Sequence, residues 1–236
     1  MSQAKDRVCL LVNGYVGNNA GVYIPESVLG VIIKFYGFYD ISFKSDILID
    51  NKVGLMELIC NKLNNNYIRL SRIYSGKNDG FRAKTFHKLC DDRGPTLSVI
   101  LNEFGYIFGG YAKVSWKGTF EYTYVTDPDA FLFNLFPTNK IYVPKGRYKQ
   151  TIRHQRTHLI QFGGGASLKI HDKCNINRKS NSCPFSYDIP NVNEFVGGNP
   201  NGRPLTSINF MVTNMEVFKV IDNESIKGES NQNMEQ

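Results

Sequence analysis

Residues 79–100 read DGFRAKTFHKLCDDRGPTLSVI, and this stretch carries the clearest structural pattern in the chain. Its middle, RAKTFHKLC (82–90), predicts a short helix, because Ala83, Phe86 and Cys90 recur at helical spacing and form an apolar stripe. The polar residues DDRGP that follow predict the end of the helix and a turn. TLSVILN (96–102) then predicts a strand, since it is rich in apolar and β-branched residues.

The same stretch holds a histidine three positions before a cysteine. On a helix, His87 and Cys90 would be neighbours, and a histidine beside a thiol can lower the thiol pKa and create a nucleophile. Cys90 also occupies a position where a small core residue belongs. No glycine-rich helix start follows that could form an oxyanion hole. The pattern therefore favours a structural role, and the alternative is a thiol enzyme or peroxide scavenger that uses Cys90, or Cys174 with Cys183.

The chain outside this stretch divides near residue 66. Before it, Val8–Val12 predicts a strand, and residues 25–37 and 51–64 predict helices with apolar residues at helical spacing. After it, several short segments with turn signals between them predict strands: 67–74, 106–116, 131–136, 140–143, 158–162, 167–170 and 208–220. The segments 96–102 and 106–116 are close enough to form an antiparallel hairpin. No βαβ rhythm appears, so we predict an α+β, mainly β fold of antiparallel sheets.

This division predicts three parts of the chain. Residues 1–66 form an N-terminal strand and helical segment that we expect to pack on the main domain. Residues 67–220 form the main domain. Residues 221–236 form a polar, acidic tail that is predicted to be disordered.

Composition and charge narrow the class of protein. The 236 residues are 42% hydrophobic and 13% aromatic, which is ample for a folded core. No apolar run approaches the roughly 18 residues needed to span a bilayer. Five cysteines without a secretion signal indicate free thiols in a reducing compartment, so we predict a cytoplasmic protein. The net charge is +7, and residues 67–220 carry 21 basic and 11 acidic side chains, or +10, which predicts an anionic partner.

A basic run concentrates this charge. The segment PKGRYKQTIRHQRTH (144–158) has no acidic residue. A patch of this kind could bind nucleic acid, an anionic membrane or an acidic protein surface. The run has too few aromatic residues to favour recognition of single-stranded nucleic acid. A nucleic-acid binder that uses residues 145–158 is kept as an alternative function. The candidate partner-binding residues are Lys145, Arg147, Lys149, Arg153 and Arg156.

Two other patterns predict neither a metal nor a cofactor. The spacings His154-x3-His158 and His171-x2-Cys174, followed by Cys183, resemble parts of a zinc site, but the sequence has no HExxH and no paired CxxC. The glycines of GGGAS (163–167) and GYIFGGY lack the sequence context of a phosphate-binding loop. In a sheet, such glycines more often mark bulges or close backbone approach.

Five blocks of sequence, taken in order, resemble the TLDc domain of the oxidation-resistance proteins. They are SGKNDGFRAKTFHKLCDDRGPTLSVI, GYIFGGYAKVSW, DPDAFLFNL, FGGGASLKI and EVFKV, which together run from about residue 67 to 220. The segment RKSNSCPFSYDIPNVNEFVGGNPNGRPL (178–205) is long and irregular and departs from the commonest pattern of the family. The positions that match the family motif are Asp79, Gly80, Phe81, Phe86, His87, Cys90, Asp91, Gly94, Thr96, Phe108, Gly109, Gly110, Trp116, Phe131, Phe133, Phe162, Gly163, Gly165 and Leu168.

The resemblance implies a fold and two functional themes. The fold is two antiparallel β-sheets packed as a sandwich with a few short helices around it. The themes are resistance to oxidative stress and binding to the vacuolar proton pump, V-ATPase. The resemblance supplies no catalytic residues, so we expect a non-catalytic interaction module without a cofactor. Its contact surface would be formed by the loops around 144–158 and 172–206.

Overall fold

A computed structural model describes residues 40–65, 67–146, 149–198 and 207–222. The strand predicted at residues 8–12, the helix at 25–37 and the disorder of the tail beyond residue 222 lie outside these ranges. The chain divides into two compact units. Of the described residues, one unit contains 40–44, 50–65, 67–70 and 221–222, and the other contains 45–49, 71–146, 149–198 and 207–220.

The first unit contains the helix predicted at 51–64, which the structure places at α3 (Lys52–Leu63). Its buried residues include Leu55, Leu58 and Ile59, the apolar positions that predicted it. The helix ends at Asn64, whose left-handed backbone (φ 50°) caps its last turn. The ammonium of Lys52 donates a hydrogen bond to the backbone carbonyl of Phe43 at 2.7 Å.

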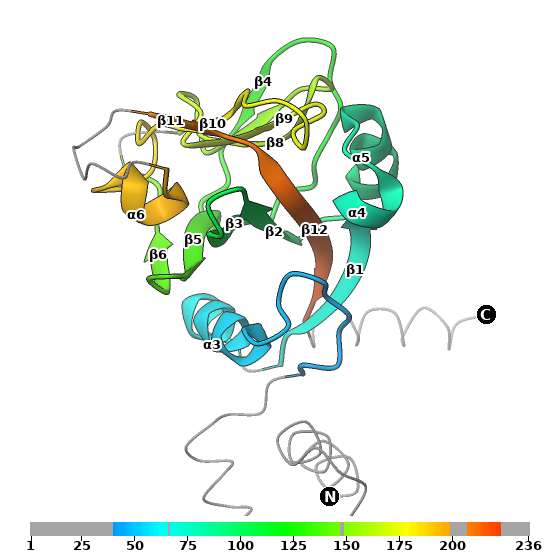
Figure 1. Cartoon of the computed structure of the whole chain (residues 1–236), viewed down its shortest axis with the longest axis vertical. Helices are drawn as coiled ribbons and strands as arrows, with labels where there is room; N and C mark the ends of the chain where they lie inside the picture. The colour runs from blue at the N-terminus through cyan, green and yellow to red at the C-terminus, as the bar shows by residue number, and fades with distance from the viewer. Residues whose placement is uncertain (1–39, 66, 147–148, 199–206, 223–236) are drawn as a thin grey trace, which may run out of the picture. The chain divides into compact units, whose positions relative to one another are not determined.

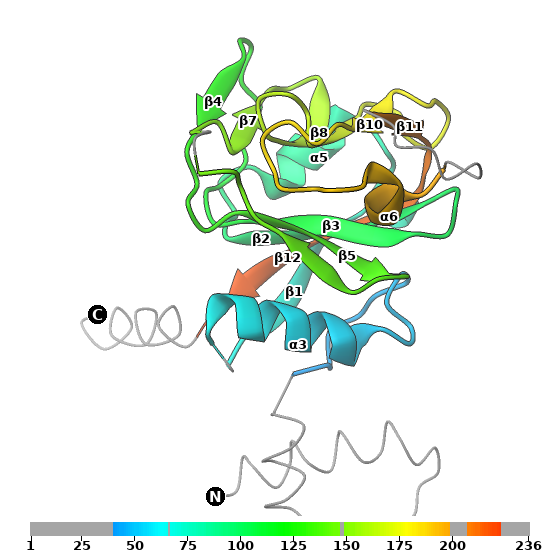
Figure 2. The same cartoon turned by 90° about the vertical axis from the view of Figure 1, so that its left-hand side faces the viewer.

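The second unit is built on two six-stranded sheets packed against each other (Figures 1 and 2). The paired strands of both sheets run antiparallel, which confirms the predicted mainly β sandwich. The first sheet has the order β1 (Arg69–Ser75), β12 (Val212–Ile221), β2 (Thr96–Asn102), β3 (Ile107–Ala112), β5 (Phe131–Phe136) and β6 (Lys140–Tyr142). The second has the order β11 (Ile208–Phe210), β10 (Ser180–Ser182), β9 (Leu168–His171), β8 (His158–Phe162), β7 (Ile152–His154) and β4 (Thr123–Val125).

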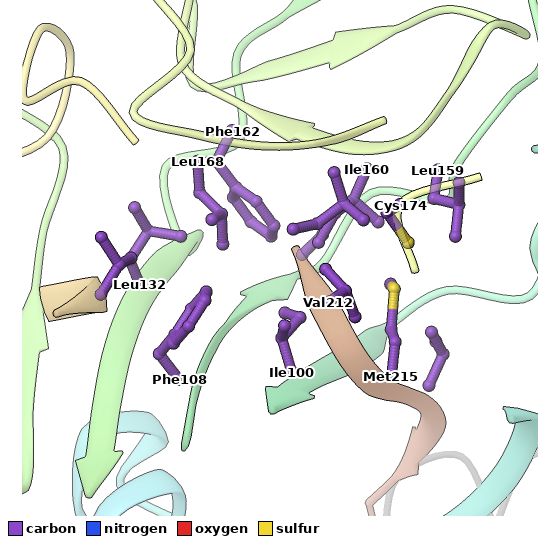
Figure 3. Packing of buried hydrophobic residues seen from close by; sticks show 14 of the residues in the cluster. Ile100, Phe108, Leu132, Leu159, Ile160, Phe162, Leu168, Cys174, Val212 and Met215 are labelled. Atoms are coloured by element: carbon purple, nitrogen blue, oxygen red, sulfur yellow. The ribbon is translucent and has the colours of Figure 1, made fainter. Parts of the chain in front are cut away.

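The core lies between these sheets. Figure 3 shows side chains of the first sheet, such as Phe108 and Met215, facing side chains of the second, such as Phe162 and Leu168. Gly110 in β3 is needed for this packing, because a Cβ there would lie 2.6 Å from the ring of Phe162. Paired glycines in a strand therefore mark close approach, as the sequence predicted.

The sole tryptophan, Trp116, is 1% exposed and belongs to the same core. Its ring contacts those of Phe86 and Phe162, with centroids 6.3 and 5.5 Å away. Its indole N–H donates to the hydroxyl of Thr96 at 3.0 Å, so the one polar atom of this large side chain is satisfied.

Three short helices of the described residues accompany the sandwich. α5 (Ala83–Cys90) is the helix predicted at 82–90, and its buried residues are Ala83, Phe86 and Cys90, the predicted stripe. Residues Gly76–Asp79 form one helical turn, α4, and the Asp79 carboxylate accepts the N–H of Ser75. α6 (Val192–Val196) was not predicted.

A buried carboxylate ties the segment 45–49 to the first sheet. Glu216 of β12 is 0% exposed. It accepts hydrogen bonds from the Ser45 hydroxyl, from the Asp46 N–H at 2.9 Å and from the Arg72 guanidinium at 2.6 Å. Arg72 also pairs with the Asp46 carboxylate at 3.0 Å. Since a buried charge is costly unless paired and hydrogen-bonded, these three partners together make this position tolerable for Glu216.

Candidate partner-binding surface

The histidine that precedes Cys90 holds α5 in place. His87 Nδ1 lies 2.7 Å from a carboxylate oxygen of Asp91, and its Nε2 lies 3.1 and 2.9 Å from the backbone carbonyls of Gln155 and His158. All three partners place oxygen acceptors against the ring nitrogens. The other oxygen of Asp91 accepts the N–H of Gly118 at 2.7 Å. The pair thus links the helix to two loops and to the start of β8.

The geometry gives no support to a nucleophilic Cys90. The residue is 0% exposed, and burial, together with the negative charge of Asp91, raises the pKa of its thiol. Burial likewise raises the pKa of Cys174 to about 12, and Figure 3 places this residue within the core cluster. A thiolate at neutral pH needs a lowered pKa, so neither residue has the environment of a reactive cysteine. Cys183 is partly exposed.

The histidines of the possible zinc site lie on different faces of the second sheet. His154 is buried and its ring lies 6.2 Å from that of Trp116, on the core side. His158 and His171 pair across β8 and β9, with ring centroids 4.9 Å apart. Within the described ranges, no three His, Cys, Asp or Glu side chains are grouped so that they could hold a metal ion.

The structure divides the predicted basic run. The ammonium of Lys145 donates to the carbonyl of Pro184 at 3.1 Å, so this lysine lies with the loop that follows β10. Lys149 is exposed, and its backbone carbonyl accepts from the hydroxyl of Thr126. Arg147 lies outside the described residues. Arg153 and Arg156 lie together on and beside β7, and they form the centre of the candidate surface.

Both arginines stack on exposed aromatic rings from the segment around β4. The guanidinium carbon of Arg153 lies 3.6 Å from the ring centroid of Tyr122 and 5.6 Å from that of Tyr124. That of Arg156 lies 3.7 Å from the ring of Phe120. The three rings are 79% (Phe120), 62% (Tyr122) and 42% (Tyr124) exposed. Apolar surface left to solvent in this way is typical of a binding site. We call Phe120, Tyr122, Tyr124, Arg153, Arg156 and Lys169 the arginine–aromatic surface.

Carboxylates of the described residues do not pair with the cations of this surface. The pKa of Lys169 in β9 is lowered by burial and by the nearby charge of Arg153. No ion pair among the described residues involves Arg153, Arg156 or Lys169. Elsewhere in the described chain, arginines such as Arg72 and Arg178 do pair with carboxylates. Unpaired cations gathered on one face favour an anionic partner.

The sequence reasoning found the two arginines but missed the rings beside them. A signal was present, because TFEYTYV (119–125) carries an aromatic residue at every second position, as one face of a strand does. The segment is separated from the arginines by about 30 residues of chain, so only the pairing of β4 with β7 brings them together.

Comparison with known families agrees with this architecture. The family model described as the TLDc domain matches residues 41–221 of the chain. The chain belongs to the TLDc family. A 57-residue stretch of this TLDc protein is also 35% identical to part of a protein of Danio rerio described as MTOR-associated protein MEAK7. That stretch covers 24% of the present chain and 12% of the Danio rerio protein, so the similarity concerns a small part of that relative.

The family-motif positions of this TLDc domain lie mainly in the core. Phe86, Thr96, Phe108, Trp116 and Phe162 are all buried. Gly163 has a positive φ of 81°, which a glycine adopts without strain. These placements support a structural role for the motif. Among the described helices of the domain, none has the length and apolar character needed to cross a membrane.

Proposed function

We propose that this chain is a non-catalytic docking module that binds the vacuolar proton pump, V-ATPase, and acts in resistance to oxidative stress in the cytoplasm. The proton pump and the stress theme come from the resemblance to the oxidation-resistance proteins. The single observation that supports docking is the arginine–aromatic surface, whose cations have no carboxylate partner within the described chain. Exposed aromatic residues and arginines are the residue types enriched at protein interfaces.

The chemistry of the other candidate residues supports docking over catalysis. His87 uses both ring nitrogens to hold α5, so it has no free nitrogen to act as a base. Cys90 and Cys174 are buried with raised thiol pKa values. Among the described cysteines, a thiol-based scavenger would therefore have to rely on Cys183, the one that is partly exposed.

The test is capture of the proton pump by the full, tagged chain from its own cells, followed by mass spectrometry. We compare the wild type with the double variant Arg153→Glu, Arg156→Glu. The matched control is Lys84→Glu, Lys88→Glu, which makes the same charge change at two exposed positions of α5. We expect the wild type and the control to retain pump subunits. The arginine variant should retain about tenfold less, because the introduced glutamates repel an anionic partner.

Two results would count against this proposal in different ways. If the wild type captures no pump subunits, the proposed partner is wrong. If the arginine variant captures as much as the control, the partner stands but the surface is elsewhere.

A further inference from the structure

The strand β4 forms one edge of the second sheet. It pairs with β7 on one side, with Tyr124 opposite Arg153, and it is the last strand in the sheet order. Figure 2 shows it at the end of that sheet beside β7. An edge strand presents backbone N–H and C=O groups that another strand can pair with. Proteins commonly block such edges with charged side chains, especially lysine, or with proline, but β4 itself (Thr123–Val125) contains neither.

The composition of this edge favours pairing. The sequence TFEYTYV (119–125) consists mostly of threonine, tyrosine, phenylalanine and valine, which are the residue types that strands prefer. Thr123 and Tyr124 of β4 are exposed. An exposed, β-prone edge without a blocking residue is therefore a template for an additional strand.

The stacked arginines add a chemical preference to this template. Each guanidinium lies over an aromatic ring, which restrains its orientation, while its N–H donors lie along its edge. A restrained guanidinium can bind a carboxylate through two parallel hydrogen bonds. Arg153 stands directly across from Tyr124 in the register, so a carboxylate bound to it would lie close to the edge of the sheet.

We infer that β4 accepts an extended, acidic segment of a protein partner as an additional strand, with carboxylates of that segment bound to Arg153 and Arg156. Because side chains on one face of a strand come from every second residue, the segment would carry acidic residues at alternate positions. Only a polypeptide supplies the backbone groups that the open edge pairs with, which favours this partner over a nucleic acid. The inference rests on the proposed docking function and specifies the chemistry of the docked segment.

The first arm of the test measures how peptide binding depends on charge. The probe is a short fluorescein-labelled peptide of alternating glutamate and threonine, and its binding to the full chain is followed by fluorescence anisotropy. We expect binding that weakens about tenfold with Arg153→Glu, Arg156→Glu and is unchanged with Lys84→Glu, Lys88→Glu. A peptide with lysine in place of glutamate should not bind.

The second arm measures strand pairing without altering the protein. Two further peptides carry N-methyl groups on alternate residues, so that each peptide has the N–H groups of one edge blocked and keeps its charge. We expect one of them to lose binding and the other to retain it, because an added strand pairs through only one edge. Hydrogen exchange should show slower exchange of the β4 amides only with peptides that bind.

Each contrary result has its own meaning. If both N-methylated peptides bind as well as the parent, the surface binds acidic groups without strand pairing, and the inference is overturned while charge-based docking stands. If the glutamate peptide does not bind at all, or if a single-stranded oligothymidylate binds more tightly than the peptide, the inference is likewise overturned. If the peptide arms succeed but the proton pump is not captured, the inference stands and the proposed partner fails.

Discussion

The surroundings of Cys90 determine the chemical reactivity of its thiol. Its thiol is on the core side of α5, at 0% exposure, and burial raises its pKa. The spacing of Ala83, Phe86 and Cys90 was enough to predict this burial from the sequence. The two carbonyl acceptors beside His87 could not be predicted, because Gln155 and His158 lie about 70 residues along the chain.

At this scale we predict that peroxide and alkylating agents react with Cys183 much faster than with Cys90 or Cys174 in the folded protein. Only Cys183 of these three is partly exposed, and a buried thiol with a raised pKa forms little thiolate. The measurement is time-resolved labelling with iodoacetamide, read by mass spectrometry. In denaturant the three rates should converge, and equal rates in native buffer would contradict the burial described here.

At the scale of the element, α5 is held by the pair His87 and Asp91 as well as by its apolar stripe. We predict that His87→Ala lowers the free energy of unfolding by about 2–3 kcal/mol, because two backbone carbonyls and a carboxylate lose the ring nitrogens that they contact. Urea unfolding followed by the fluorescence of the sole tryptophan, Trp116, measures this change. Lys88→Ala, on the exposed face of the same helix, is the control and should have little effect.

The double variant His87→Ala, Asp91→Ala tests whether the contact between the two residues, rather than each residue alone, stabilises the protein. If the two residues act as one link, the double variant costs less than the sum of the single variants. Additive effects would mean that each residue holds the helix independently.

The elements also show where prediction from sequence ends. β2 and β5 begin and end where the sequence placed them, because long apolar runs bounded by turn residues are unambiguous. The strands β4, β7 and β10 have three residues each and were missed. β7 and β10 have too few residues to show a period, whereas the alternation around β4 was present but was overlooked. The arginine–aromatic surface depends on two of these short strands, so its aromatic half was missed with them.

At the scale of the whole molecule, the balance of charge makes stability depend on pH. Burial, together with the charges of His171, Lys169, Arg153 and His87, lowers the pKa of His158 to about 4. The pKa of His154 is also lowered by burial. Between about pH 6.5 and pH 4 the unfolded chain therefore binds more protons than the folded chain, so stability rises with pH across this window and falls on acidification.

We predict that His158 alone contributes on the order of 2–3 kcal/mol to this loss between pH 7 and pH 4. The variant His158→Asn should show a correspondingly shallower dependence of the unfolding free energy on pH over that interval. Urea titrations at several pH values provide the measurement. Identical pH dependence in variant and wild type would show that His158 protonates as easily in the folded protein as in the unfolded chain.

The sandwich itself could be predicted as a class but not as a topology. Antiparallel sheets follow from the short strands and turns, and the family resemblance adds the packing of two layers. The order that places β12 between β1 and β2 depends on contacts between residues more than 100 positions apart, which no local pattern encodes.

The contacts of Glu216 set a lower limit on the piece of this chain that can be expected to fold by itself. A fragment that starts at residue 67 would keep the carboxylate and Arg72 but would lose the Ser45 hydroxyl and the Asp46 amide. A charge that is 0% exposed would then keep one of its three partners. A few residues ahead of the first strand therefore decide whether a shortened gene yields folded protein. A shortened chain should begin upstream of Ser45.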